Sequence, residues 1–445
     1  MDPKGNRVFR QEHFILASLL AIGFIGLALM RSGDEAELQQ GLYAAVHFQG
    51  ELAFVVRLDV DDSFTLAEAL GLEPDGLPQV HFEVRDGSMA FVESDCPDLL
   101  CVAMGHQSRL GGFAACLPNR LLFHIEGAKH SLFSTVYFDM FDTLIFLRFF
   151  ALEQAEFDRL ADAVYDELLR LHMLFDIYNE YYGINNVSTI NKMAGISPVT
   201  VDKTLLEMVD AGIEAYHQSE GAVNIALGSV LRLWHDFFSG AVDSPPHISL
   251  LGEAMLLSNI DDVIVDRELS QVYLTKGGMS LDLGALAKGF ALEHVLALAD
   301  DLGITSGIIS MGGDMVLIGS PLDGRDAWTV GIENPMTGGA GLFGTMQLAG
   351  TSVATSGNYL RNVVHDGRNY HHIIDPGTLV PADQFISLTI VHPSPFVAEF
   401  LTTAAFVLPF ESGIGLVESL GAQGLWILPD GSYRHTDDFI FTVVE

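Results

Sequence analysis

The sequence is poor in basic residues and in cysteine, and it has no internal repeat, long linker or low-complexity segment. It carries 22 Lys and Arg against 58 Asp and Glu, a formal net charge of −36 at pH 7. A field of that sign repels nucleic acid and anionic lipid, so we expect no nucleic-acid partner. An anionic substrate would need a local cation or a metal. The acidity itself is typical of solubility in a salty or otherwise unusual medium and indicates no reaction type.

Only three cysteines occur, Cys96, Cys101 and Cys116, and all lie in the first third of the chain. If this region is exported, a disulfide is permitted, and Cys96 with Cys101 is the pair nearest in sequence. A zinc site would need a fourth ligand such as His106. The simplest interpretation is a structural domain that holds either one bridge or buried thiols.

A long uncharged apolar run occupies residues 13–30, with Lys4, Arg7 and Arg10 before it and acidic residues after it. Its length is close to the minimum that crosses a bilayer, and the charge bias predicts a cytoplasmic segment 1–12 with the rest exported. A cleaved signal peptide is the alternative, but no small-x-small cleavage site follows the run. We therefore expect a membrane anchor with the remaining chain on the extracytoplasmic face of the cell membrane.

With 445 residues, 49% of them hydrophobic, the chain can bury two or three separate cores. Residues 42–127 alternate apolar and polar in short runs separated by Asp-Gly and Gly-Gly, which predicts a small all-β domain. Residues 131–445 mix both periodicities and predict an α+β domain. The expected segments there are a strand pair at 136–150, helices at 157–175, 203–217 and 398–407, and strands at 262–274, 307–318 and 328–333.

The segment Met279–Ala291, MSLDLGALAKGFA, reads as a strand that turns directly into a helix. If the helix starts near Gly284, its free N–H groups and the ammonium of Lys288 face one place, which suits a phosphate. Asp282 and Ala285 stand at the same junction. An ordinary strand-to-helix turn with a surface lysine is the alternative.

Two further polar segments follow along the chain. In SMGGDMVLIGS, Gly312 and Gly313 permit a ligand to approach the backbone closely, although a β-bulge has the same composition. The neighbouring Asp314 suits a ring N–H, a ribose hydroxyl or a metal better than a phosphate. In ATSGNY, Ser356 and Gly357 could donate hydrogen bonds to a phosphate or to the edge of a flavin.

The segment HHIIDP offers a general base, because a histidine with a pKa near neutrality can take a proton from a hydroxyl. Two adjacent histidines in a strand point to opposite faces, so at most one of His371 and His372 should enter a site. In AEFLTTAAF, Glu399 and Thr403 share one helical face, where their oxygens could bind a hard cation. An ordinary helical turn is the alternative.

The order and content of these blocks resemble the ApbE family, the FAD:protein FMN transferases, over residues 136–441. The resemblance is carried by LFDIYNEYYGINNVSTIN, GAVNIALGSVLRLWHDF, SLDLGALAKGFALE, ISMGGDMVLIG, WTVGIENP, VATSGNY, HHIIDP, SLTIV and AEFLTTAAFVL. It implies a mixed α/β transferase domain and Mg²⁺-dependent transfer of FMN from FAD to a Thr or Ser hydroxyl of another exported protein, with release of AMP.

The resemblance also implies roles for single residues. His372 would be the base that activates the acceptor hydroxyl. Metal ligands would come from Ala285, Glu399, Thr402 and Thr403. The residues that would line the flavin nucleotide are Asp282, Lys288, Gly312, Gly313, Asp314, Ser356 and Gly357. The family usually has Asp where this chain has Glu399, and the Ser-Gly-Ala-Thr type of acceptor segment is absent here, so the acceptor should be a separate protein.

A second resemblance covers residues 42–127. The pieces ESDCPDLLC and CLPNRLLFHIEG resemble NusG domain II and imply a small β-barrel-like domain without assigned chemistry. Two functional alternatives stay open for the whole chain: an FAD pyrophosphatase, in which water replaces the acceptor hydroxyl, and a non-catalytic flavin-binding or docking protein.

Overall fold

The computed structural model describes residues 42–109, 111–127 and 130–444, and it divides at His130 into two compact units. The expected membrane anchor at 13–30 lies outside the described residues. Within those residues no helix has both the length and the apolar character needed to cross a membrane.

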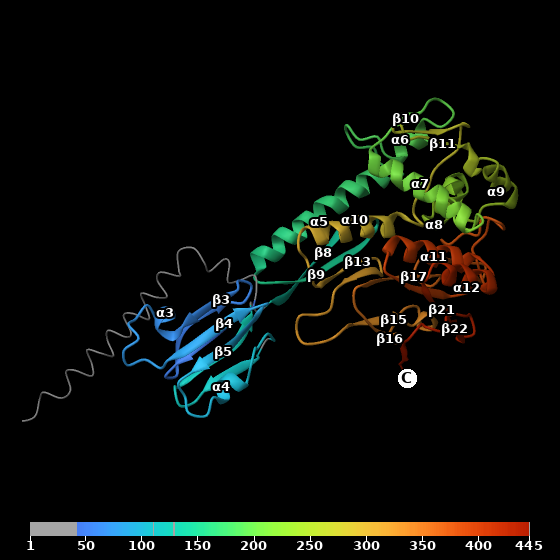
Figure 1. Ribbon diagram of the computed structural model, residues 1–445. Helices are drawn as coiled ribbons and strands as arrows, with labels where there is room; N and C mark the ends of the chain where they lie inside the picture. Colours follow the sequence, from blue (N-terminus) through green and yellow to red (C-terminus); the bar gives the residue numbers. More distant parts are fainter. Residues whose placement is uncertain (1–41, 110, 128–129, 445) are drawn as a thin grey trace, which may run out of the picture. The chain divides into compact units, whose positions relative to one another are not determined.

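The first unit consists mainly of two antiparallel sheets (Figure 1). One sheet has the order β2-β1-β7-β6, with β1 at Leu42–Phe48, β2 at Glu51–Arg57, β6 at Phe113–Cys116 and β7 at Leu121–Gly127. The other contains β3 at Asp62–Thr65, β4 at Val80–Arg85 and β5 at Ser88–Ser94. Inward-facing aromatic residues such as Phe82, Phe91 and Phe123 form the core between them. The unit also holds two short helices, α3 (Leu66–Leu70) and α4 (Leu100–Ala103), which the strand pattern did not predict.

The second unit is built on an eight-stranded antiparallel sheet with the order β22-β21-β20-β17-β14-β13-β9-β8. Its strands are β8 (Ser131–Met140), β9 (Thr143–Ala151), β13 (Gly307–Met311), β14 (Asp314–Ile318), β17 (Thr351–Gly357), β20 (Ser387–His392), β21 (Gln423–Ile427) and β22 (Tyr433–His435). Because side chains alternate along each strand, this sheet feeds two cores. In β9, for example, Ile145 and Leu147 enter one core and Phe150 enters the other.

Helices cover the first of these faces. Helices α5 (Gln154–Phe175), α10 (Ala287–Asp301) and α11 (Pro395–Val407) pack against the strands and against one another, and α12 (Phe410–Ser419) packs on α11 (Figure 1). The second core includes residues of β15 (Trp328–Glu333) and β16 (Leu342–Leu348), which form a small sheet with β23 (Thr442–Val443). The mixed α/β architecture is the one expected.

The remaining elements build the far end of this unit. They are α6 (Val187–Lys192), β10 (Val199–Thr200), α7 (Lys203–Gln218), α8 (Gly228–Phe238), α9 (Ile248–Met255), β11 (Val263–Asp266), β12 (Gln271–Leu274), β18 (Asn362–His365) and β19 (Arg368–His371). Apolar residues of α8 pack with those of the β18–β19 hairpin, including Trp234 against Tyr370. This packing fixes the hairpin that leads into His372.

The expected strands at 262–274 and 307–318 are each a hairpin of two strands, β11–β12 and β13–β14. The expected strand-to-helix element is wrong. The stretch before Lys288 is not a strand of any sheet, and α10 begins at Ala287 rather than near Gly284. The reason is a side chain that takes the place of a neighbouring strand. Asn191 accepts a hydrogen bond from the Leu281 N–H at 2.7 Å and donates one to the Leu281 carbonyl at 2.9 Å. The segment is therefore extended without a β partner.

Candidate active site

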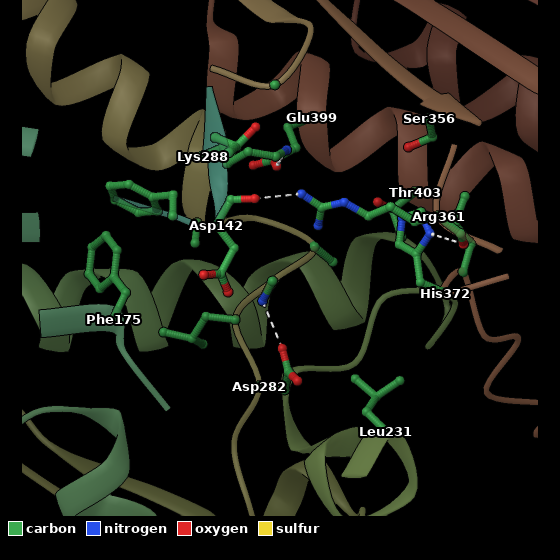
Figure 2. A pocket seen from close by; sticks show the side chains of 18 of the residues that line it. Asp142, Phe175, Leu231, Asp282, Lys288, Ser356, Arg361, His372, Glu399 and Thr403 are labelled. Carbon is green, nitrogen blue, oxygen red and sulfur yellow. Dashed lines mark hydrogen bonds and ion pairs between the residues drawn. The ribbon is translucent and has the colours of Figure 1, made fainter. Parts of the chain in front are cut away.

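A cavity of about 630 Å³ opens in the second unit, where two hairpin turns, the segment before α10, β17 and α11 converge. Six carboxylates line it but only two cationic side chains do: Asp139, Asp142, Asp176, Asp282, Asp314 and Glu399 against Lys288 and Arg361. Figure 2 shows Lys288 beside Glu399, with Arg361, His372 and Thr403 grouped in another part of the cavity. The walls are therefore acidic overall, and the positive charge is local.

The two hairpin turns that reach the cavity have the same backbone form. Phe141 and Asp142 join β8 to β9 with φ of 54° and 48°, and Gly312 and Gly313 join β13 to β14 with φ of 61° and 99°. Two consecutive positive φ angles are the mark of a two-residue type I′ turn. At Gly312 a side chain is excluded as well, because a Cβ would lie 2.3 Å from Thr143 Oγ1. Gly312 thus lets the two turns meet.

The segment before α10 presents its own backbone to the cavity. Asp282 Oδ1 accepts the Gly284 N–H at 2.9 Å, and the Asp282 N–H donates to the Ile225 carbonyl at 2.9 Å. Asp282 is thereby fixed in a tight local turn, with Ala285 beside it on the cavity wall.

Lys288 forms two buried ion pairs, with Asp314 on β14 and with Glu399 on α11. The lysine side chain is 25% exposed toward the cavity, whereas those of Asp314 and Glu399 are 5% and 4% exposed. Asp314 also accepts the Thr355 N–H at 3.1 Å. The expectation that Lys288 stands free to face phosphates is therefore incomplete, because in the structure its ammonium already serves two carboxylates.

The first turn of α10 is likewise not an open anion site. Glu399 Oε2 accepts the Gly289 N–H at 2.5 Å, so the protein's own carboxylate takes one of the free helix N–H groups. Gly289 is required for this contact, since a Cβ there would lie 2.8 Å from Glu399 Cβ and 2.6 Å from the Pro395 carbonyl. The missing side chain lets α10 and α11 approach each other.

The protonation states of this cluster follow from its surroundings. Burial alone would lower the pKa of Lys288, but the charges of Asp314 and Glu399 outweigh it and raise that pKa, so the lysine stays charged. Burial raises the pKa of Glu399 and outweighs the opposing effect of Lys288. The single positive charge of Lys288 does not fully neutralise the carboxylates of Asp314 and Glu399. The cluster therefore attracts a further cation.

The two adjacent histidines have separate environments, as the strand argument anticipated. His371 is 3% exposed; its Nε2 donates to the Ala382 carbonyl at 2.6 Å and its Nδ1 accepts the Ile373 N–H at 3.3 Å. Both ring nitrogens are therefore used in the fold. His372 instead lines the cavity.

His372 is arranged as a neutral acceptor. Its Nδ1 lies 3.4 Å from the Arg361 carbonyl, to which only a protonated nitrogen can donate, so Nε2 carries the lone pair. His372 is solvent-exposed within the cavity, and desolvation by the surrounding protein lowers the pKa of His372 to about 4. The imidazole is unprotonated at neutral pH and can accept a proton.

Arg361 connects the β8–β9 turn to His372. Its Nη2 donates to the Asp142 carbonyl at 2.9 Å, in the β8–β9 turn, while its own carbonyl orients His372 (Figure 2). The guanidinium brings a second cation to the cavity and is fixed there by the Asp142 carbonyl. Sequence reasoning assigned no role to Arg361, which stands only four residues after Gly357 in the same polar segment.

Helix α11 supplies oxygen atoms of the kind that a hard cation prefers. Glu399 and Thr403 both line the cavity from one face of the helix, and the Ala285 backbone is on the facing segment. The Thr402 hydroxyl donates to the Glu399 carbonyl at 2.7 Å, which leaves its oxygen lone pairs and the Thr402 carbonyl as candidate ligands. A carboxylate has about four lone-pair sites, and Glu399 uses two, so the donor set fits Mg²⁺.

The structure brings together nearly all residues that the sequence singled out. Those that line the cavity are Asp282, Ala285, Lys288, Gly312, Asp314, Ser356, Gly357, His372, Glu399, Thr402 and Thr403. Gly313 is not among the lining residues; it completes the turn behind Gly312. Sequence reasoning missed Asp142, Asp176, Tyr178 and Asn224. Three of these stand in the blocks LFDIYNEYYG and GAVNIALG, where a polar residue in an apolar context was the available signal.

Asp176 shows how one missed residue shapes the wall. Its carboxylate accepts the N–H groups of Tyr178 and Asn179 and the hydroxyl of Tyr181 at 2.7 to 3.0 Å. Burial would raise the pKa of Asp176, but these hydrogen bonds outweigh it and lower that pKa. The loop after α5 is therefore held by an ionised carboxylate, and it presents Tyr178 to the cavity with its hydroxyl 3.0 Å from His235 Nδ1.

Comparison with known proteins gives two family matches and several similar relatives. Residues 141–426 match the ApbE family and residues 15–129 match NusG domain II. A protein of Klebsiella pneumoniae named FAD:protein FMN transferase is 31% identical over 256 residues, which cover 56% of this chain and 78% of the relative. A Treponema pallidum protein of the same name is 34% identical over 262 residues, which cover 56% of this chain and 72% of the relative.

Solved structures give the same result for the fold. The ApbE protein of Thermotoga maritima superimposes with a TM-score of 0.63 at 27% identity, over 69% of this chain and 97% of that protein. The flavin transferase ApbE of Vibrio cholerae superimposes with a TM-score of 0.60 at 22% identity, over 69% of this chain and 97% of that protein. The chain belongs to the ApbE family.

Proposed function

We propose that the chain is an FAD:protein FMN transferase, which moves FMN from FAD to a Thr or Ser hydroxyl of a separate exported protein and releases AMP. This proposal rests on one observation. The same cavity contains a neutral histidine that can act as a base and a buried carboxylate cluster whose negative charge Lys288 does not fully neutralise. The names of the relatives support FAD as the substrate and a protein as the acceptor.

In this reaction the acceptor hydroxyl attacks the phosphorus of the FMN half of FAD. An oxygen–phosphorus bond forms, the bond from that phosphorus to the AMP phosphate breaks, and AMP leaves. His372 Nε2 takes the hydroxyl proton as the attack proceeds, because its Nδ1 is already committed to the Arg361 carbonyl. Phosphoryl transfer needs positioning and charge stabilisation more than covalent catalysis, and rigid walls supply the positioning.

The pyrophosphate charge has to be offset in a cavity with six carboxylates and two cationic side chains. We propose that Glu399, Thr403 and the carbonyls of Ala285 and Thr402 hold Mg²⁺. When bound, such an ion polarises phosphoryl oxygens and neutralises charge on the leaving group. Lys288 favours the ionised form of Glu399 against the effect of burial and holds its carboxylate in place, and Arg361 offers a second cationic contact. Asp282, Gly312, Ser356 and Gly357 line the remaining nucleotide surface.

We also propose that the enzyme is held at the extracytoplasmic face of the cell membrane by residues 13–30. The support is the charge asymmetry around that apolar run, with Lys4, Arg7 and Arg10 on one side and acidic residues on the other. Acceptors would then be exported subunits of redox complexes.

Measurement of AMP release tests the proposed reaction. The full chain is incubated with FAD and Mg²⁺, with and without a protein that carries a Ser-Gly-Ala-Thr segment. We expect AMP in proportion to the acceptor present and little AMP without it. Equal release of AMP and free FMN in both reactions would identify a pyrophosphatase, and no AMP in either would leave a binding protein.

A further inference from the structure

The three cysteines of the first unit form one cluster. Cys96 follows β5, Cys101 lies in α4 and Cys116 ends β6, so three separate elements deliver one sulfur each. All three Sγ atoms lie within 4.8 Å of one another, and Cys96 Sγ is 3.4 Å from Cys101 Sγ. All three are free thiols, exposed by 4% or less. The disulfide permitted by the sequence is therefore not formed in the structure.

We propose that Cys96, Cys101 and Cys116 bind a thiolate-preferring metal ion, Zn²⁺. In a tetrahedral site with Zn–S bonds of about 2.3 Å, neighbouring sulfurs lie about 3.8 Å apart. One sulfur pair here is 3.4 Å apart and no pair is more than 4.8 Å apart, so small rotations of the side chains suffice. Buried single cysteines commonly act as small apolar residues, but that role does not require three of them to converge.

The surroundings of Cys96 suit a metal-bound thiolate. The N–H of Cys96 donates to Ser94 Oγ at 3.2 Å, which fixes the loop. Ser94 Oγ also lies 3.7 Å from Cys116 Sγ. Hydrogen bonds of this kind orient ligands and stabilise their charge. The fourth position falls to an oxygen, for which the Asp98 carboxylate, 3.5 Å from Cys96 Sγ, is at hand.

His106, the residue that the sequence suggested as a fourth ligand, is held elsewhere. Its Nδ1 bonds to Ser88 Oγ at 2.9 Å and its Nε2 lies 3.1 Å from Glu83. Both ring nitrogens are thus occupied outside the thiol cluster. His106 is therefore not a ligand in this arrangement, and it becomes a useful control.

Cobalt spectroscopy on the full chain, purified in detergent under reducing conditions, tests the proposal. Co²⁺ bound by thiolates gives a sulfur-to-metal charge-transfer absorption, whereas Co²⁺ on surface carboxylates gives none. Because the chain has only three cysteines, any such band comes from this cluster. We expect one equivalent of Co²⁺ per chain, displacement by Zn²⁺ but not by excess Mg²⁺, and release of protons as the thiols ionise.

Two variants complete the test. Cys116→Ser should weaken Co²⁺ binding at least tenfold and remove most of the band, while His106→Ala should leave both unchanged. If Cys116→Ser does not fold, the native chain is alkylated with and without added Zn²⁺. Protection of its three thiols by Zn²⁺ gives the same information. Three reduced thiols without a band or protection, or a Cys96–Cys101 disulfide in the freshly isolated chain, would overturn the proposal.

Discussion

Lys288, in the first turn of α10, forms a buried ion pair with Glu399 on α11, 111 residues further along the chain. The pair stands where Gly289 lets the two helices touch, and Asp314 on β14 joins it from the sheet. The same contact thus locks the core and prepares one wall of the cavity. Glu399 contacts Lys288 with one carboxylate oxygen while its other oxygen accepts the Gly289 N–H.

Substitution of Lys288 by Met should destabilise the protein by about 3 kcal/mol, because removal of one partner leaves buried charge without compensation. Two carboxylates would then face each other, and the pKa of Glu399, which burial already raises, would rise further. The folded state would hold protons that the unfolded chain releases, so the variant's free energy of unfolding should fall as pH rises above about 4. Urea unfolding over a pH series measures both effects.

The matched control for that variant is Lys276→Met. Lys276 pairs with Asp262 but is 49% exposed, and exposed pairs contribute about 0 to 1 kcal/mol. A loss of equal size in the two variants would show that the buried position of Lys288 has no special effect on stability.

Gly312→Ala should reduce stability more than Gly313→Ala. Both positions have positive φ, which costs about 1–2 kcal/mol for a residue with a Cβ. Only Gly312 adds a clash, with Thr143 Oγ1 at 2.3 Å, whereas nothing lies within 4 Å of a Cβ at Gly313. Thermal unfolding of both variants isolates the cost of the close approach; indistinguishable melting temperatures would contradict it.

His371 and His372 should separate stability from catalysis. His371→Ala leaves the Ala382 carbonyl and the Ile373 N–H without partners and should cost about 2 kcal/mol. His372→Ala should change stability little. It should lower the transfer rate at least a hundredfold, since a positioned general base accelerates a reaction by about 10²–10⁴-fold. Urea unfolding and single-turnover rates on both variants test this; FAD binding should survive in His372→Ala.

The pH dependence carries two signatures of these histidines. Since the pKa of His372 is about 4, the transfer rate should show no loss near pH 6.5 and should fall only as pH approaches 4. Burial lowers the pKa of His371, so protonation favours the unfolded chain, and stability should decline as pH falls below about 6.5. Initial rates and unfolding at matched pH values distinguish the effects. A rate that halves near pH 6.5 while the protein stays folded would contradict the assignment of His372.

Local patterns in the sequence were sufficient for the helices α5, α7 and α11. The apolar residues that share one helical face in the sequence are all buried on α5: Phe157, Leu160, Ala161, Val164, Leu168, Leu171 and Leu174. The glycine pair at 312–313 forms a hairpin turn inside the expected strand 307–318, which the sequence pattern did not predict. The segment before Lys288 was wrongly predicted to be a strand. A sequence pattern that favours an extended backbone does not show whether that backbone pairs with another strand or with a side chain. Asn191, ninety residues earlier, supplies that side chain here.

The sequence predicted which residues lie in the site better than it predicted the hydrogen bonds and ion pairs between them. Short motifs placed Glu399, Lys288 and His372 near a ligand, but periodicity could not show that Lys288 is already paired or that Arg361 reaches Asp142 across 219 residues. The cysteine cluster was equally hidden, since spacing along the chain identifies the nearest pair and not a group of three that meets in space.

The central claim is transfer of FMN to protein with His372 as the base. Its most direct test is the intact mass of an acceptor protein with a Ser-Gly-Ala-Thr segment after incubation with FAD, Mg²⁺ and the full chain. We expect the acceptor to gain the mass of one FMN less one water, and to gain nothing with His372→Ala that still binds FAD. An acceptor left unchanged by the native enzyme, or modified equally by the variant, would contradict the account.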